Sequence, residues 1–523
     1  MLSTAVKRHF SQNARLNKTV AIMANSKSGD LVGQRIMQSL KAVSGVQDFD
    51  FFGYGGAAMK AEGMAGGIEV DMNDMMNKEF ITTRKTKNYS EVQYSTKYNF
   101  LNLINKHFVR GTNNLLEQFD KVEVARRIYN ARPSIVLAID NEQIAFHIND
   151  QLKGFYQNSA NALPRRHFHN RFIKDYKQWA TNYLDFVHYT LPLSYGAADG
   201  FQFPGEYAGQ YGAYEALRHL YSQSQNLRHL LKPDSMLISR RYFASELEKG
   251  IQQVREQWRA QQGIPQDGTT VFFAPGNEVK EAEFCMDSVR KGVREFLLKY
   301  SSPTSLSPKA PGLESYTTVI SVQRGSESEA YIRQFIQEKE WLGRVIIVTN
   351  EDNEHFNAMA ASDMGIIYDG QLIASAAACH LPTMVLANLR MHHQWFSDLY
   401  NRWWTPMNII ADNNVYPELI GGEVWHGKVA DTLAEWYVKP EIRYDMVRKM
   451  EYFLKDSLSF KPLDRNVVRG RDLVVSGEAY DEFKDPFRQI AHHLWADIQA
   501  YELRVSTPIP HLSALNAEVP KLY

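Results

Sequence analysis

One turn of this sequence has the residue types that hold a diphosphate. An apolar run at 270–273 leads into the turn 275–278 (Pro-Gly-Asn-Glu), and a helical pattern begins near Val279. A turn from strand to helix presents backbone N–H groups and the positive end of a helix dipole, which together favour phosphate. The residue at the mouth of the turn is Glu278, an anion where a cation would be useful. The turn therefore predicts an anion site with an opposing charge.

A second candidate for chemistry is Asp140, which directly follows the apolar run 135–139. A carboxylate at a strand end can act as a general base and take the proton of a hydroxyl group. A lone aspartate in this place is also a common helix cap or turn residue. Both roles stay open for Asp140 on the sequence alone.

Two other turns are rich in small residues. Ser28-Gly29-Asp30 lies after the apolar run 19–23, and Gly55-Gly56 follows the run 49–52. Glycines permit tight turns and a close approach of two backbones, so packing explains them as well as binding does. Residues 25–29 are not a phosphate loop, because the first glycine of that motif is missing.

Strands that alternate with helical patterns must position these turns. We expect strands at 19–23, 49–52, 135–139, 270–273, 317–322, 344–348, 364–368 and 383–386. A turn is expected at 25–30, and apolar spacing predicts a helix over 31–43. This alternation predicts an α/β protein of two Rossmann-like units with mostly parallel sheets. Ligands of such sheets bind at the carboxyl ends of the strands, so we expect a cleft between the units.

The expected organisation has four parts. They are a targeting-like segment at 1–18, an N-terminal domain at 19–205 with a helical insertion at 84–130, a nucleotide-side domain at 206–440, and C-terminal helices with an extended tail at 441–523. The Pro/Ser-rich stretch 301–315 is expected to be a surface loop, because strands of one pattern flank it.

Composition narrows the classes of function. The 523 residues include 59 basic and 59 acidic ones, so no net charge attracts nucleic acid. Two cysteines are too few for a disulfide framework and indicate a reducing compartment. No apolar run is long enough to span a bilayer. The adjacent histidine pairs 392–393 and 492–493 would chelate a metal poorly, so we expect no metal and no cofactor.

The amino terminus indicates a compartment. The first 29 residues contain no Asp or Glu, while Lys7, Arg8, Arg15, Lys18 and Lys27 are basic. A basic, amphipathic terminus without acids is typical of mitochondrial targeting, and a disordered basic tail is the alternative. Targeting would place the chain in the matrix or at the matrix face of the inner membrane.

In their order, these turns resemble the motifs of bacterial lipid-A-disaccharide synthases. Residues 24–30 are similar to the family's A-G-E-A-S-G-D, and residues 53–63 to its G-x-G-G-x-x-M-x-x-E-G. Residues 275–281 resemble P-G-S-R-x-x-E, and residues 369–375 resemble S-G-T-A-x-L-E. The matched positions are Ser28, Gly29, Asp30, Gly55, Gly56, Gly276, Asn277, Glu278, Glu281, Gly370, Gln371 and Ser375.

The resemblance covers roughly residues 19–440 and implies an inverting glycosyltransferase of the GT-B arrangement. Members of this family join a UDP-diacylglucosamine donor to a diacylglucosamine phosphate acceptor. Asp140 corresponds to the first carboxylate of the family's I-D-A-P-D-F, which implies that it would be the catalytic base.

The resemblance breaks at polar positions that are expected to face the donor. Glu278 stands where the family has Arg, which reverses a charge beside the expected diphosphate. At about 4 Å and an effective dielectric constant of about 20, that reversal costs several kcal/mol. Ser375 stands where the family has the Glu that is expected to hold the ribose hydroxyls. Turn glycines and core strands are kept, and this pattern indicates a pseudoenzyme.

Three interpretations follow. The favoured one is a non-catalytic, structural or accessory subunit of a large mitochondrial inner-membrane complex, either of the respiratory chain or of ATP synthase. Its partners would be the other subunits of that complex, and a bound lipid is a further option. The expected contact regions are residues 84–130, an aromatic cluster at 395–404 and the C-terminal tail. The alternative is an active transferase that uses Asp140 and a UDP-sugar to modify a lipid-linked sugar phosphate. The third is a sensor that binds a nucleotide without turnover.

Overall fold

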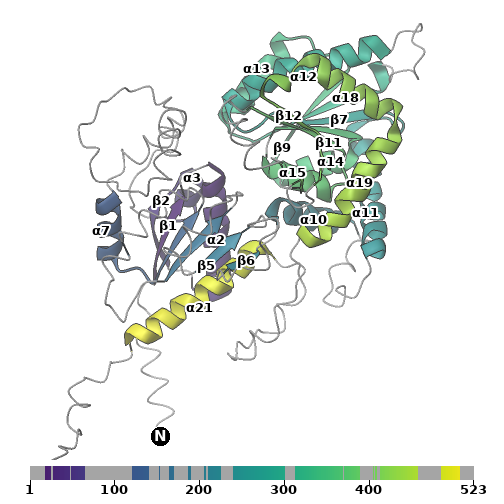
Figure 1. Ribbon diagram of the computed structural model, residues 1–523. Helices are drawn as coiled ribbons and strands as arrows, with labels where there is room; N and C mark the ends of the chain where they lie inside the picture. The colour runs from purple at the N-terminus through teal and green to yellow at the C-terminus, as the bar shows by residue number, and fades with distance from the viewer. Residues whose placement is uncertain are drawn as a thin grey trace, which may run out of the picture. The chain divides into compact units, whose positions relative to one another are not determined.

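The computed structural model describes 18–24, 27–46, 49–64, 121–139, 152, 164–169, 186–189, 205–207, 210–224, 240–300, 313–368, 370–388, 405, 407–408, 413–457 and 485–506. The chain divides into two compact units (Figure 1). Unit 1 comprises residues 1–189, 196–207 and 487–523, and unit 2 comprises 190–195 and 208–486. The final helix therefore belongs to unit 1, although most of the preceding chain belongs to unit 2.

Unit 1 contains one parallel sheet in the strand order β2-β1-β3-β4-β5-β6. Its strands are β1 (Lys18–Ala24), β2 (Phe49–Tyr54), β3 (Ile135–Ile139), β4 (Arg165–His169), β5 (Phe186–Tyr189) and β6 (Gly205–Tyr207). Its helices are α2 (Lys27–Ser44), α3 (Ala57–Ala61), α7 (Lys121–Ala131) and α21 (Pro486–Ser506). The buried apolar residues of β1 and β3, which pair in parallel, form the centre of this sheet.

Unit 2 contains a second parallel sheet in the order β12-β11-β10-β7-β8-β9. Its strands are β7 (Thr269–Ala274), β8 (Tyr316–Val322), β9 (Arg344–Thr349), β10 (Met364–Ile367), β11 (Thr383–Ala387) and β12 (Glu418–Ile420). Its helices are α10 (Tyr211–Gln223), α11 (Arg240–Gln262), α12 (Val279–Tyr300), α13 (Glu327–Glu338), α14 (Glu354–Ala361), α15 (Gly370–Ala378), α18 (His426–Val438) and α19 (Pro440–Ser457). Short 3-10 turns lie at Leu313–Ser315, Glu351–Asn353 and Gly421–Glu423.

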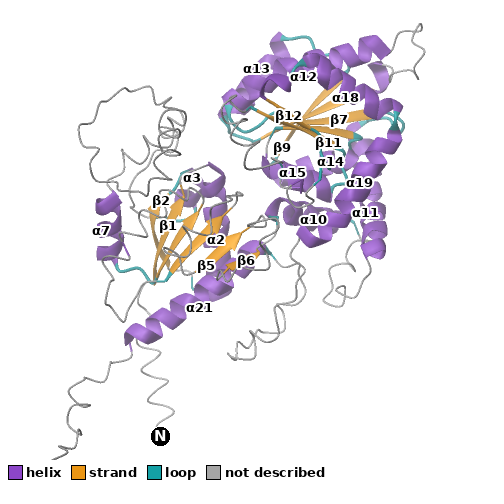
Figure 2. Cartoon of the chain, in the orientation of Figure 1, coloured by secondary structure: helices purple, strands orange, loops and turns teal. Residues whose placement is uncertain are grey.

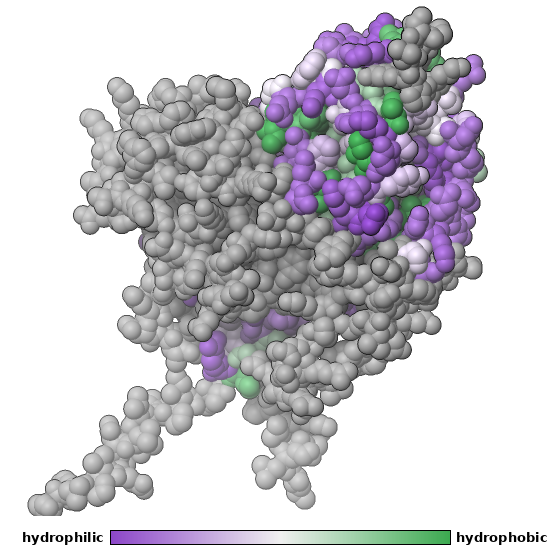
Figure 3. All heavy atoms as spheres, turned by 45° about the vertical axis from the view of Figure 1, so that its right-hand side comes forward, coloured by the Kyte–Doolittle hydropathy of each residue, from purple (hydrophilic) through white to green (hydrophobic). Residues whose placement is uncertain are grey.

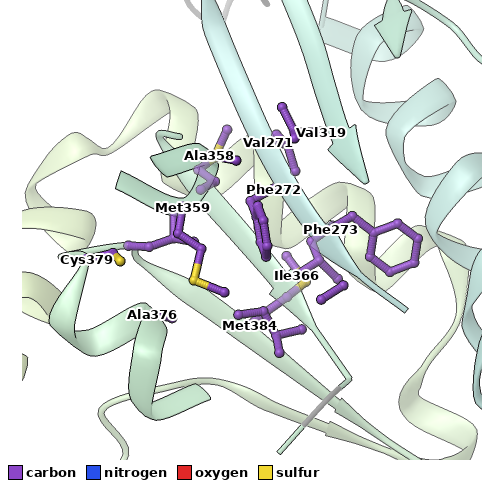
Figure 4. Packing of buried hydrophobic residues seen from close by; sticks show 14 of the residues in the cluster. Val271, Phe272, Phe273, Val319, Ala358, Met359, Ile366, Ala376, Cys379 and Met384 are labelled. Carbon is purple, nitrogen blue, oxygen red and sulfur yellow. The ribbon is translucent and has the colours of Figure 1, made fainter. Parts of the chain in front are cut away.

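The sheet of unit 2 is the middle of three layers (Figure 2). Helix α12 contacts both α13 and α18 on one side, and α10 and α14 contact each other and both α11 and α15 on the other. Every residue of β7 and β8 is buried, as expected for parallel strands covered on both faces. Figure 4 shows Phe272 and Phe273, which are neighbours on β7, pointing to opposite faces of the sheet. The core of the unit thus lies on both sides of its central strands.

Helix α21 packs on the sheet of unit 1 through both apolar and charged contacts. The Trp495 ring meets the Phe49 ring edge-on at 6.2 Å, and Lys18 Nζ lies 4.1 Å from the centre of the Trp495 ring. Lys18 Nζ also forms an ion pair with Glu502 at 2.9 Å. The start of β1 is therefore held by residues almost five hundred positions later.

The predicted α/β class with two parallel sheets is confirmed, and so is each of the strands expected from apolar runs. The turn expected at 25–30 is wrong in its second half, because α2 begins at Lys27 and includes 28–30. Asp30 lies in the first turn of α2, where its negative charge is favourable near the positive end of the helix dipole. Of the expected helical insertion at 84–130, the structure describes only the residues from 121, which form α7. The aromatic cluster at 395–404 and the tail after 506 lie outside the described residues.

Candidate functional site

The Ser-Gly-Asp motif of unit 1 is tied to the glycine pair after β2. The Asp30 carboxylate accepts hydrogen bonds from three backbone N–H groups at the start of α3, those of Gly56 (2.8 Å), Ala58 (2.9 Å) and Met59 (3.1 Å). These N–H groups would otherwise have no partner within their helix. Asp30 is buried, so its carboxylate holds the start of α3 against α2.

The glycines beside this contact are closely packed. A Cβ atom on Gly56 would lie 2.5 Å from Asp30 Oδ2, and one on Gly55 would lie 2.6 Å from Met59 Sδ. Gly53 has a φ of +135°, and a Cβ there would collide with the carbonyl oxygen of Ile22. Gly53 and Gly56 are therefore needed for the fold itself, whether or not a ligand binds, whereas the flexible Met59 side chain could move away from a Cβ on Gly55.

The remaining candidates of unit 1 are less well placed. Gly29 is buried in the first turn of α2, and Ser28 precedes it in the same helix. Asp140 comes directly after the last residue of β3 in the sequence, but it lies outside the described residues. The proposed catalytic base therefore stays a prediction.

The turn between β7 and α12 is closed by a side chain of its own helix. Glu281 Oε2 accepts hydrogen bonds from the backbone N–H groups of Asn277 (2.8 Å) and Glu278 (3.1 Å). Gly276 has a φ of +104°, and a Cβ there would lie 2.7 Å from the Cβ atom of Glu281. The N–H groups predicted to receive a phosphate are thus already bonded to a carboxylate, and that carboxylate needs the glycine to reach them.

The electrostatic surroundings of this turn are acidic. Tyr368 follows β10, and its ring meets the Phe284 ring edge-on at 6.1 Å. Burial is the main cause that raises the pKa of Tyr368 to about 12, and the negative charges of Glu281 and Glu278 add to the rise. Both carboxylates therefore lie near this hydroxyl group. Lys280, the nearest cation along the chain, is exposed to solvent.

Ser375 is occupied inside the fold. Its side chain is 1% exposed, and its hydroxyl donates a hydrogen bond to the carbonyl oxygen of Gly212 at 2.9 Å. This bond joins α15 to α10 within unit 2. Gly370 and Gln371 are the first two residues of α15. The position expected to hold ribose hydroxyls is thus a buried contact between two helices.

Two participants were not predicted from the sequence, namely Tyr368 and Gly212. Tyr368 was expected only as the end of a strand, although an aromatic residue at the carboxyl end of β10 is a usable signal for a residue at this edge. Gly212 gives no such signal, because it accepts the hydrogen bond from Ser375 with its backbone carbonyl oxygen, a group that every residue has.

The chemistry of the described turn is that of a closed helix start. The side chains at this turn are the carboxylates of Glu278 and Glu281 and the phenol of Tyr368, which keeps its proton at neutral pH. A diphosphate bound here would be repelled by the two negative carboxylates. Among the residues that the structure describes, no group of three or more His, Cys, Asp or Glu side chains is arranged to hold a metal ion.

Comparison with solved structures finds distant likenesses. The UDP-GlcNAc 2-epimerase of Neisseria meningitidis bound to UDP-GlcNAc is similar at 10% identity and a TM-score of 0.42, over 85% of this chain and 99% of that chain. The OtsA apo structure is similar at 9% identity and a TM-score of 0.41, over 95% and 100% of the two chains. A glycosyltransferase from Rickettsia africae is similar at 10% identity and a TM-score of 0.37, over 94% and 100%.

These likenesses are to proteins of the GT-B fold, and the fold class itself rests on the strand order of the two sheets. No protein-family model matches the sequence, and no curated protein is significantly similar to it.

Proposed function

We propose that this chain is a non-catalytic protein built on a glycosyltransferase scaffold of the lipid-A-disaccharide synthase type. In this proposal it serves as a structural or accessory subunit of a large mitochondrial inner-membrane complex, of the respiratory chain or of ATP synthase. The observation that carries the proposal is the bonding of the motif residues. Asp30, Gly56, Gly276 and Glu281 each have a role inside the fold that explains their presence without a substrate.

The residues that differ from the motifs support the same proposal. Glu278 adds a negative charge at the turn where a diphosphate would have to bind, beside Glu281. Ser375 replaces a carboxylate with a hydroxyl group that is already bonded to Gly212. A donor would therefore face repulsion at its phosphates and would lack the expected acceptor for its ribose.

The place in the cell is proposed from the amino-terminal sequence, which is basic and free of acids. None of the helices that the structure describes combines the length and apolar character needed to span a bilayer. In the proposal, the chain is attached to its complex through contacts with other subunits.

Native electrophoresis of gently solubilised mitochondria, followed by mass spectrometry of each band, tests the proposal. The chain is expected to migrate with the known subunits of one large membrane complex. An unrelated matrix enzyme in the same gel serves as the control for trapping of soluble proteins. Migration as a free monomer or dimer would contradict the subunit role.

An active transferase is the second candidate, and one observation favours it. Asp140 directly follows β3, the place in the sequence where the resembling motif has its base. Under this alternative, Asp140→Asn abolishes sugar transfer and leaves migration of the chain unchanged. Under the subunit proposal, Asp140→Asn changes neither.

A further inference from the structure

The two described sheets have four edge strands, and β9 differs from the other three. An edge strand presents unpaired backbone N–H and C=O groups, and proteins commonly limit this with short strands or charged side chains. Strands β6 and β12 have three residues each, and β2 carries the exposed Asp50. Strand β9 has six residues, and after its first residue, Arg344, it continues as Val, Ile, Ile, Val and Thr. This edge therefore lacks the usual protection against pairing with another strand.

The backbone of β9 is regular along its whole length. Its residues pair with β8 in one unbroken parallel register, from Arg344 opposite Thr317 to Thr349 opposite Val322. The strand contains no proline, and no bulge interrupts this register. Within the described part of the chain, β8 is the one strand that pairs with β9, so the backbone groups on the other side of β9 are unpaired there. A further strand can therefore add to this edge.

The side chains around this edge are apolar and incompletely covered. Among the described residues, fourteen half-buried apolar side chains pack against the core of unit 2, and eight of them lie between 331 and 347. They include Tyr331 and Phe335 of α13, whose ring centres are 6.1 Å apart, and three residues of β9. The described face in Figure 3 shows the more common surface, which is mainly hydrophilic with isolated apolar side chains. A concentration of apolar side chains along one edge indicates a contact surface.

The sequence of β9 is complementary to a second copy of itself. In an antiparallel pair with its two-fold axis at Ile347, positions equally distant from 347 lie opposite each other. Ile347 then lies opposite Ile347 of the second copy, Ile346 opposite Val348, and Val345 opposite Thr349. All five positions are β-branched, and pairs of such residues stabilise neighbouring strands.

The charges at the two ends of β9 favour the same arrangement. Arg344 donates hydrogen bonds to two backbone carbonyl oxygens at the end of α11 (3.0 and 2.7 Å), and it forms no ion pair with a described residue. Glu351 and Asp352 follow β9 and are exposed. Glu351 is paired with Arg324, whereas Asp352 has no ion pair among the described residues. Antiparallel pairing brings Arg344 of each copy beside this acidic end of the other copy.

We propose that β9 pairs antiparallel with β9 of a second copy of this chain, with the two-fold axis at Ile347. The two six-stranded sheets would then form one continuous sheet in a dimer. A strand pair alone is a small interface, so the half-buried apolar residues of α13 would be part of the contact. The inference goes beyond the proposed function and does not depend on it, since two copies can pair inside a larger complex or outside one.

A lysine at the centre of the edge tests the pairing in the purified full-length chain. Ile347→Lys would place two like charges opposite each other across the two-fold axis, which is unfavourable. Natural edge strands often carry lysine, so unit 2 should still fold, and hydrogen exchange of β7 and β8 checks this. Ile420→Lys is the matched control, because Ile420 is also half-buried and lies on β12, the opposite edge of the same sheet.

Sedimentation equilibrium at about 1–100 μM chain measures the dissociation constant of a micromolar dimer. The wild type and Ile420→Lys are expected to reach twice the 60.1 kDa of one chain. Ile347→Lys is expected to raise the Kd at least about tenfold, which corresponds to about 1.4 kcal/mol. A monomeric wild-type chain would overturn the inference, and so would an unchanged Kd in Ile347→Lys. Either result leaves the subunit role standing, because that role is tested by migration in mitochondrial extracts.

A cysteine at the same position tests the register. The two natural cysteines, Cys285 and Cys379, are buried, so they compete little for a thiol reagent. Directly opposite Cβ atoms lie about 4.5–5.5 Å apart in an antiparallel pair, so a short thiol cross-linker should join two copies that carry Ile347→Cys. Copies that carry Ile420→Cys should stay unlinked. Equal linkage at the two positions, or none at 347, would overturn pairing through Ile347.

Discussion

Replacing Asp30 with Ala separates a structural role of the motif from a catalytic one. The carboxylate of Asp30 receives three N–H groups at 2.8–3.1 Å, all at the start of α3. Hydrogen bonds to a charged group contribute about 1.5–3 kcal/mol each, and buried N–H groups left without a partner are costly. Water can enter the space that Ala leaves, so the three losses do not add fully. We expect the free energy of unfolding of unit 1 to fall by about 3–5 kcal/mol.

Hydrogen exchange measured by mass spectrometry in increasing urea is the suitable assay. It reports β1, β2 and α3 separately from unit 2, whereas a single unfolding curve would mix two units. Exchange in unit 2 is expected to stay unchanged. Asp50→Ala is the matched control, because Asp50 is exposed on β2 and accepts a long hydrogen bond of 3.4 Å from the Thr19 hydroxyl. It should change stability by less than about 0.5 kcal/mol. If Asp30→Ala left the exchange of unit 1 unchanged, the structural account of this motif would be refuted.

Two further predictions concern unit 2. Gly276→Ala places a Cβ against Glu281 at a φ of +104°, so we expect a loss of about 1–3 kcal/mol, seen as faster exchange in the first turn of α12. Burial lowers the pKa of both His355 and His380 to about 4. Because the unfolded chain binds protons near its ordinary pKa, the stability of unit 2 is full above pH 6.5 and falls as pH drops toward 4. The loss of unfolding free energy at pH 5 is about 2 kcal/mol for each histidine. Urea unfolding measured between pH 7.5 and pH 5 should therefore show a smaller loss for His355→Gln than for the wild type. An equal loss in the two proteins would contradict this prediction.

The sequence predicted eight of the twelve strands that the structure describes, because those eight are short, mostly apolar runs with a polar or glycine-rich end. It missed β4, β5, β6 and β12, which have three to five residues and include polar ones. The runs at 270–273 and 317–322 fall within β7 and β8, whose residues are buried on both faces. Parallel strands that helices cover on both faces must be apolar on both faces, so they are recognisable in a sequence as continuous apolar runs. The start of α2 is four residues earlier than predicted, because Ser28, Gly29 and Asp30 are common turn residues that here belong to the first turn of the helix.

The candidate site could be predicted only in part. The turn at 275–278 was identified from the sequence. The hydrogen bond from the Asn277 N–H group to the Glu281 carboxylate was not, because it depends on how the first turn of α12 directs the Glu281 side chain. The bond from Ser375 to Gly212 joins positions 163 residues apart, and a carbonyl acceptor leaves no trace in residue types. Long-range contacts of this kind need the three-dimensional arrangement.

Titration of UDP into the purified full-length chain, followed by calorimetry, tests the central claim most directly. The account predicts no saturable binding up to about 1 mM UDP, since Glu278 and Glu281 oppose the diphosphate and Ser375 is occupied. Saturable binding with a micromolar Kd, together with sugar transfer that Asp140→Asn abolishes, would contradict it.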